Sequence, residues 1–217
     1  MHALVHRASP STAPQGHVLG SPRLYDVSAE FFFLGRRRAT YQALISAVGI
    51  RRGQRVLDVG SGTGYFARLI AQTVGPGGLV LGVDPSESMI AYARRKAVGA
   101  VNCEFQVGTA QALPVPADHF DVVTTSLVMH HLPEGLRLSA MREMWRVLRP
   151  GGRLLVAEAQ MPRRGWGWRL LGRAHGYDRM AREVPALEPL AAAAGFTEIR
   201  ANQAPPWLRY ITAVKAE

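Results

Sequence analysis

A short apolar segment runs into three closely spaced glycines and then into an amphipathic stretch, and this junction constrains the fold most strongly. The segment Arg55–Val59 has the composition of a buried strand, and Tyr65–Val74 has helical spacing. Gly60, Gly62 and Gly64 lie between them. Glycines at such a junction allow a tight turn and let a ligand approach bare backbone. The junction predicts an α/β domain with a ligand site at the carboxyl end of its strands.

The alternation of strand and helix continues along the chain. Further strands are expected at Leu79–Asp84, Val101–Val107, Asp121–Thr125 and Arg153–Ala159, with helical patterns at Leu24–Val48, Ser86–Val98 and Leu136–Leu148. The last two runs, Phe196–Asn202 and Leu208–Lys215, are joined by a short link and predict a hairpin. We therefore predict an α/β, Rossmann-like, seven-stranded, mostly parallel sheet with an antiparallel last strand and helices on both faces.

Composition excludes several other classes of protein. With 47% hydrophobic and 19% charged residues, the chain is neither a coiled coil nor wholly disordered. Its single cysteine, Cys103, excludes an internal disulfide and a cysteine-built metal site, and we expect no metal. The first twenty residues lack the apolar core of a secretory signal, so we expect a cytoplasmic protein.

The net charge of +10 could indicate nucleic acid, anionic lipid or an acidic small molecule as partner. All but two of the 26 basic residues are arginine, however, and the chain is also rich in Ala, Gly and Pro. These residues share GC-rich codons, so genome composition explains much of the excess. The charge by itself therefore identifies no partner.

Two acids flank the glycine junction and indicate the kind of ligand. Asp84 ends the second strand, twenty residues after Gly64, where a carboxylate can accept hydrogen bonds from the two hydroxyls of a ribose. Asp58 precedes Gly60 by two residues, and its charge would repel a pyrophosphate but suits an α-amino group or a sulfonium. The spacing G-x-G-x-G also differs from the dinucleotide pattern. Both features argue against a nicotinamide-dependent oxidoreductase.

At these residues the sequence resembles the class I S-adenosylmethionine-dependent methyltransferases of the small-molecule (type 11) kind. The resemblance covers residues 51–158 densely and includes Gly108–Pro114, a cofactor motif in which Thr109 replaces the family's Asp, and the helix–turn–strand text Trp145–Leu155. It implies S-adenosyl-L-methionine as cofactor and S-adenosyl-L-homocysteine as product. The cofactor-binding residues it implies are Tyr25, Asp58, Gly60, Ser61, Gly62, Gly64, Asp84, Pro85, Ser86, Met89, Thr109, Ala110 and Ser126.

Methyl transfer requires the enzyme to align the acceptor, exclude water and, for some acceptors, remove a proton. Candidate catalytic residues are His130 and His131 after the fourth strand and Glu158 at the end of the fifth. Of the two histidines, His130 is the one we expect to face the site. The alternative is that one histidine packs beside the cofactor or caps the following helix. For Glu158 the favoured interpretation is a surface acid paired with an arginine.

The resemblance also divides the chain. We expect a mobile N-terminal tail at 1–20 and one domain at 21–217, made of lid helices at 21–50, a cofactor-binding core at 51–160, a substrate cap at 161–195 and a terminal β-hairpin at 196–217. Phe31–Phe33 could line an acceptor pocket or belong to the core. The Arg- and Trp-rich stretch Arg163–Arg173 could contact a membrane surface or nucleic acid; a cap helix is the favoured interpretation, and membrane contact comes next.

We therefore predict methyl transfer to an O, N or C atom of a small or lipid-like acceptor by a monomer or homodimer. A nucleic-acid methyltransferase is the alternative enzyme, but Ser126–Met129 lacks the paired prolines and aromatic residue of amino-methylating DNA enzymes. A cofactor-binding protein without catalysis is a further alternative.

Overall fold

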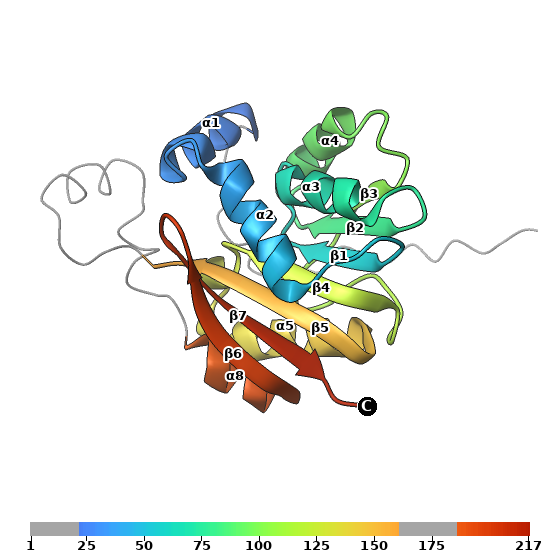
Figure 1. The fold of residues 1–217 in the computed structure, drawn as a ribbon, viewed down its shortest axis with the longest axis vertical. Helices are drawn as coiled ribbons and strands as arrows, with labels where there is room; N and C mark the ends of the chain where they lie inside the picture. Colours follow the sequence, from blue (N-terminus) through green and yellow to red (C-terminus); the bar gives the residue numbers. More distant parts are fainter. Residues whose placement is uncertain (1–21, 161–185) are drawn as a thin grey trace, which may run out of the picture.

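The structure is a computed structural model that describes residues 22–160 and 186–217 of the chain (Figure 1). The predicted tail at 1–20 and the stretch Arg163–Arg173 lie outside the described residues. The helices are α1 (Pro22–Phe32), α2 (Arg37–Val48), α3 (Tyr65–Val74), α4 (Glu87–Lys96), the 3₁₀ helix η1 (Met129–His131), α5 (Glu134–Val147) and α8 (Leu187–Ala193). No helix among these residues is long and apolar enough to cross a bilayer.

One seven-stranded sheet organises the described chain. Its strands are β1 (Arg55–Val59), β2 (Leu79–Asp84), β3 (Cys103–Val107), β4 (Phe120–Ser126), β5 (Leu148–Ala159), β6 (Phe196–Ala204) and β7 (Leu208–Lys215). They lie in the order β3-β2-β1-β4-β5-β7-β6. The first five pair in parallel, whereas β7 runs antiparallel to both β5 and β6. The predicted fold class, including the antiparallel last strand, is confirmed.

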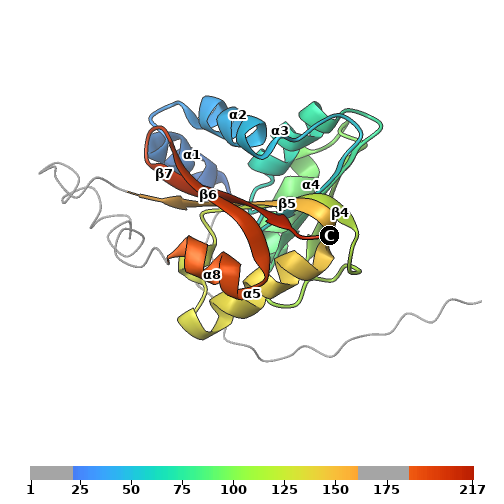
Figure 2. The same cartoon turned by 60° about the horizontal axis from the view of Figure 1, so that its bottom comes forward.

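Helices cover both faces of this sheet, and each layer has its own apolar core. Figure 2 shows α1 to α3 on one side of the sheet and α5 with α8 on the other. The first core joins residues of α2, α3 and α4 to one face of the strands, and Phe32 and Phe33 belong to it. The second core packs Ala140, Met141 and Met144 of α5 on the opposite face, with Leu187 of α8. Both faces of the central strands are therefore buried, as a parallel sheet requires.

The structure corrects several predicted boundaries. The pattern over Leu24–Val48 forms two helices, because Leu34 and Gly35 adopt positive φ angles of 52° and 71° and end α1. Strand β3 begins at Cys103 instead of Val101, which lies in a turn. Strand β5 begins at Leu148, five residues early, because Leu148 already pairs with Phe120 of β4.

The predicted substrate cap at 161–195 is described only in its last part. There the chain forms α8, which packs on α5 and β6, on the face of the sheet opposite α1 and α2. The rest of the predicted cap lies outside the described residues. The role of residues 161–195 as a cap stays a prediction.

Candidate functional site

The glycine loop after β1 packs so closely that two of its glycines have no room for a side chain. Gly60, Gly62 and Gly64 all have positive φ angles, of 71°, 50° and 73°. A Cβ on Gly60 would lie 2.2 Å from Cγ2 of Val128, and one on Gly64 would lie 2.5 Å from Cζ of Phe105. At Gly62 the nearest atom, on Tyr25, would be 3.9 Å away. Gly60 and Gly64 therefore serve packing, whereas the space beside Gly62 faces α1.

Asp84 ties the tip of this loop to the end of β2. Its Oδ2 accepts a hydrogen bond of 2.9 Å from the backbone N–H of Gly62, and its Oδ1 accepts one of 2.9 Å from the N–H of Ser86. The hydroxyl of Ser86 in turn caps α4 by accepting from the N–H of Met89 at 3.3 Å. Burial raises the pKa of the Asp84 carboxyl group. Each carboxylate oxygen keeps a lone pair for a further donor, such as a ribose hydroxyl.

Asp58 lies beneath the loop and is 2% exposed. The Thr124 hydroxyl on neighbouring strand β4 donates to its Oδ1 at 2.9 Å. Burial raises the pKa of Asp58 to about 7, and the hydrogen bond from Thr124 only partly opposes this effect. A buried carboxylate of this kind becomes stably ionised when a cation binds beside it. Asp58 is therefore suited to an ammonium group.

A cavity of about 20 Å³ lies over the loop, between it and helices α1 and α2. It is lined by Tyr25, Arg37, Tyr41, Asp58, Gly60, Ser61, Thr63, Tyr65, Phe66 and Ser126. This volume holds about one water molecule. The hydroxyl of Ser61 is buried there and has no hydrogen-bond partner among the described residues. The site thus has polar groups prepared for a ligand, while Tyr25 of α1 closes it.

Arg37 is the cationic group of this cavity and is only 3% exposed. Its guanidinium donates to Oδ1 of Asp26 on α1 at 3.0 Å and lies 3.9 Å from the ring centroid of Tyr65. The Thr63 hydroxyl of the glycine loop donates to the same Asp26 oxygen at 2.7 Å. The Nε of Arg37 is buried without a hydrogen-bond partner in the described chain. One network therefore links α1, α2 and the glycine loop.

Arg37 and Thr63 are site residues that the sequence patterns did not predict. Arg37 stands between two exposed arginines, Arg36 and Arg38, and no pattern distinguishes it from them. Thr63 lies inside the glycine motif and could have been singled out as a polar residue of that loop. The burial of a guanidinium against a carboxylate appears only when α1 and α2 are placed in space.

Glu158 and His130 form a buried pair beside the loop. Glu158 is fully buried, and its Oε1 accepts hydrogen bonds from the N–H groups of Val128 and Met129 at 3.0 and 2.7 Å. Its Oε2 lies 2.7 Å from Nδ1 of His130. The interpretation of Glu158 as a surface acid paired with an arginine was wrong, because β5 ends inside the protein and not at its surface.

This pair gives the His130 imidazole a defined orientation. When Nδ1–H donates to Glu158, the neutral ring presents Nε2 as an acceptor. Nε2 is buried and has no hydrogen-bond partner among the described residues. The ring of His131 lies 4.0 Å away, centroid to centroid. Neither histidine lines the small cavity, but Val128 at the start of their turn packs directly on Gly60.

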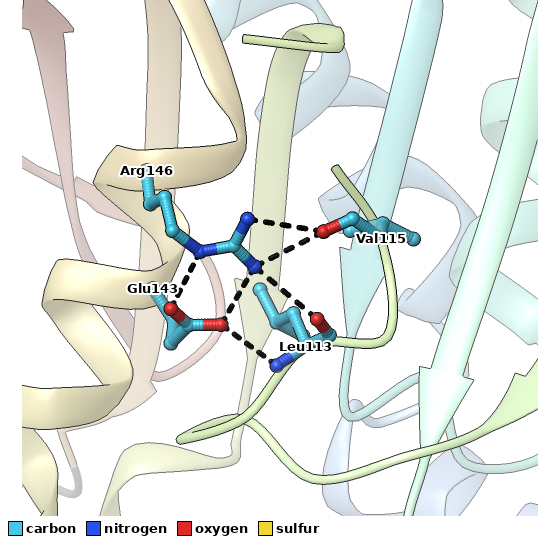
Figure 3. A network of polar contacts seen from close by, with 4 residues as sticks. All are labelled: Leu113, Val115, Glu143 and Arg146. Atoms are coloured by element: carbon cyan, nitrogen blue, oxygen red, sulfur yellow. Dashed lines mark hydrogen bonds and ion pairs between the residues drawn. The ribbon is translucent and has the colours of Figure 1, made fainter. Parts of the chain in front are cut away.

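The loop after β3, which carries Thr109 and Ala110, is fastened to α5 (Figure 3). Glu143 accepts from the N–H of Leu113 at 2.8 Å, and Arg146 donates to the carbonyl oxygens of Val115 at 3.0 Å and Leu113 at 3.2 Å. The two side chains also bond to each other, at 2.6 Å between Nε and Oε1. Neither Glu143 nor Arg146 was predicted from the sequence, because an acid and a base three residues apart are common on exposed helix faces.

The structure brings most of the predicted cofactor residues to one end of the sheet. Tyr25, Asp58, Gly60, Ser61 and Ser126 line the cavity, and Gly62, Asp84, Ser86 and Met89 are joined to it through the loop and α4. Gly108 links the Thr109 loop to the same edge by donating to the Asp84 carbonyl oxygen at 3.1 Å. Pro85 is exposed and Ala110 is buried.

The part of the chain that carries the glycine loop is similar in sequence to known proteins. Residues 56–152 match the family described as "Methyltransferase domain". The ubiquinone/menaquinone biosynthesis C-methyltransferase UbiE of Photorhabdus laumondii is 39% identical over 141 residues, which is 64% of this chain and 55% of that protein. UbiE of Serratia proteamaculans is 38% identical over 143 residues, with the same coverage. The chain thus spans about half the length of the curated relatives it matches.

Solved structures of low sequence identity share the fold. A SAM dependent methyltransferase from Aquifex aeolicus has a TM-score of 0.73 at 21% identity, covering 91% of this chain and all of that one. A protein from Bordetella parapertussis has a TM-score of 0.70 at 18% identity, covering 95% and 77%. Each of these likenesses covers at least nine tenths of the chain.

Proposed function

We propose that this chain, whose residues 56–152 match a methyltransferase domain, methylates a small lipophilic acceptor with S-adenosylmethionine. The observation that carries the proposal is the pair of carboxylates at the glycine loop, buried Asp58 beneath it and partly buried Asp84 at the end of β2. Asp58 suits an α-amino group and Asp84 suits ribose hydroxyls. The charge of Asp58 would repel a pyrophosphate.

The residues of the cavity fit the methionine end of the cofactor. Asp58 and Arg37 place a carboxylate and a guanidinium in one enclosed space, which matches the ammonium and carboxylate of an amino acid. The free hydroxyl of Ser61 adds a hydrogen-bonding group. The loop held by Glu143 and Arg146 would contact the adenine. When bound, S-adenosylmethionine supplies an electrophilic methyl group on a sulfonium.

We assign His130 as the base and Glu158 as the residue that positions it. Methylation of a carbon or oxygen atom releases a proton, and an imidazole whose Nδ1 is held by a buried carboxylate can accept it at Nε2. Helix α1, whose Tyr25 closes the cavity, would exclude water from the sulfonium of the bound cofactor. His131 remains a second candidate for the base.

The relatives named above are C-methyltransferases of ubiquinone/menaquinone biosynthesis, and from this similarity we infer that the acceptor is a carbon atom of a quinone-like molecule. This similarity supports the small lipophilic acceptor over a nucleic acid. A protein that only binds the cofactor would share the Asp58 and Asp84 geometry but would show no turnover. A membrane-associated or cytoplasmic site of action is compatible with such an acceptor.

Calorimetric titration with S-adenosylhomocysteine, with NADH in parallel, tests the cofactor assignment. We expect S-adenosylhomocysteine to bind and NADH to give no heat. Asp84→Ala should abolish binding, whereas Glu104→Ala, an exposed acid on β3, should leave it unchanged. Binding of NADH alone, or undiminished binding by Asp84→Ala, would overturn the assignment.

Turnover with a reduced, short-chain demethylquinone and labelled cofactor tests the activity. His130→Ala should lower kcat by about 10²-fold or more while changing the affinity for S-adenosylhomocysteine little. Glu158→Gln should shift the pH profile of kcat. An equal loss of kcat and of cofactor affinity in His130→Ala would instead identify His130 as a packing residue.

A further inference from the structure

Helix α1 exposes large apolar side chains on the side that faces away from the protein. Leu24, Val27 and Phe31 are 69%, 60% and 77% exposed, and Leu34 in the following turn is 54% exposed. They account for four of the seven large apolar side chains that are exposed in the described part of the chain. We call these four residues the α1 stripe.

The residues of the α1 stripe that belong to the helix all lie on one side of it. Leu24, Val27 and Phe31 are spaced three and four residues apart and therefore share one side of the helix. The opposite side is apolar as well, since Ala29 and Phe32 are buried against the protein and Tyr25 closes the cavity. A helix at the surface of a water-soluble domain normally turns polar residues outward. Helix α1 thus has a second apolar face that is exposed to water. Such a face is typical of a surface that binds an apolar partner.

The charges around the α1 stripe indicate what that partner is. Three exposed arginines flank the stripe in the sequence: Arg23 in the first turn of α1, Arg36 two residues after Leu34, and Arg38 in the first turn of α2. Glu30 is the acid on the exposed part of α1, and it lies 4.0 Å from the Arg37 guanidinium. An apolar stripe bordered by arginines is the pattern of a helix that lies at the interface of an anionic bilayer.

We propose that the α1 stripe docks on an anionic lipid bilayer, with Arg23, Arg36 and Arg38 contacting the headgroups. A second copy of the chain fits this surface less well, because a two-fold interface would bring the same arginines of both copies together. The inner side of the docked helix covers the cavity over the glycine loop. An acceptor dissolved in the bilayer would therefore meet the protein at the helix that closes its active site.

Vesicle co-sedimentation tests this docking and needs neither cofactor nor acceptor. We expect the full chain to bind vesicles of phosphatidylglycerol and phosphatidylcholine in equal parts and to bind phosphatidylcholine alone much more weakly. The variant Leu24→Gln/Val27→Gln/Phe31→Gln should bind the anionic vesicles at least about tenfold more weakly, because three large side chains no longer leave water.

A matched control is available elsewhere on the surface. Val98 and Val101 are 86% and 88% exposed beyond the end of α4, so Val98→Gln/Val101→Gln removes exposed apolar area without touching α1. This control should bind vesicles as the wild type does. Replacing Arg23, Arg36 and Arg38 by Gln should abolish the preference for phosphatidylglycerol over phosphatidylcholine.

Thermal unfolding and affinity for S-adenosylhomocysteine serve as folding checks on each variant, and Phe31→Gln alone replaces the triple variant where the latter unfolds. Equal vesicle binding by the α1 variant and the wild type would overturn the proposal, as would absence of binding by the wild type. A wild-type dimer in light scattering that the α1 variant dissociates would show that a second copy covers the stripe instead. These outcomes leave the cofactor assignment untouched, because it is measured without lipid.

Discussion

Burial of the Asp58 carboxyl group raises its pKa, and this shift should affect both stability and ligand binding. Its pKa lies at about 7 in the folded chain, compared with an ordinary value of 3.8. Between about pH 4 and pH 7 the folded state therefore holds a proton that the unfolded state has lost. The contribution of Asp58 to stability falls as pH rises through this window and stays low above it. The protein thus keeps a carboxylate that is unfavourable without a ligand and becomes favourable when it meets a cation.

The affinity for S-adenosylhomocysteine should consequently depend on pH. If the ammonium of the ligand binds ionised Asp58, the Kd should fall by up to about tenfold per pH unit as pH rises toward 7, and then level off. Calorimetry across this range, in buffers of different ionisation enthalpy, should also detect proton release on binding. Asp58→Asn should bind weakly with a flat profile. A wild-type Kd that is constant from about pH 5.5 to 7 would contradict this role for Asp58.

Arg37 supplies the opposite charge in the same cavity, and its contribution can be separated by ligand analogues. Arg37→Met should weaken S-adenosylhomocysteine by about 10- to 100-fold, because a charge-assisted hydrogen bond to the ligand carboxylate is lost. It should change the affinity for 5′-methylthioadenosine, which lacks the amino-acid part, by no more than about twofold. Arg36→Met, at the exposed neighbour, is the control. Equal losses for both ligands would mean that Arg37 only supports the packing of α1.

Between elements, Glu143 and Arg146 of α5 hold the loop that follows β3 in place. The Arg146 guanidinium bonds to carbonyl oxygens of Leu113 and Val115, so the loop follows α5 if that helix shifts. Hydrogen bonding to Arg146 lowers the pKa of Glu143 and keeps it ionised as an acceptor for the Leu113 N–H. The loop needs this support because it contains no helix or strand of its own.

Arg146→Met should therefore lower the free energy of unfolding by about 1–2 kcal/mol and weaken S-adenosylhomocysteine binding several-fold. Denaturant melts and calorimetry measure the two effects. Arg142→Met removes an exposed arginine of the same helix and should leave both values near those of the wild type. Lower stability with unchanged affinity would show that the loop does not contact the cofactor.

The candidate site lies at the carboxyl end of the sheet that joins the whole domain. Because a ligand bound there requires the folded sheet, its binding should stabilise the entire fold. At a concentration of S-adenosylhomocysteine about 100 times its Kd, linkage predicts a gain of about 2.7 kcal/mol. For a chain of this size, the gain corresponds to a rise in Tm of about 5–10 °C. Scanning fluorimetry measures this shift, with NADH as control. A shift with NADH and none with S-adenosylhomocysteine would contradict the cofactor assignment.

Much of the fold could be predicted because its signals are local. The strand–glycine–helix junction at 55–74, the acids Asp58 and Asp84, and the hairpin of β6 and β7 each depend on residues close together in the chain. Backbone preferences of glycine and apolar periodicity act over such short distances. Because strands and helices alternate along the chain, the rules for connecting them leave few possible topologies. A parallel sheet with β7 inserted beside β5 is one of these.

The sheet, the glycine loop and the two carboxylates can be predicted from local sequence patterns, whereas packing between distant segments selects the other side chains that join them. Arg37 is buried while Arg36 and Arg38 are exposed, and Glu158 binds His130 across 28 residues of chain. Apolar spacing in α1 likewise could not show which of its two faces packs inward. Burial and pairing depend on contacts between segments distant in sequence, and a local pattern carries no information about what lies opposite it.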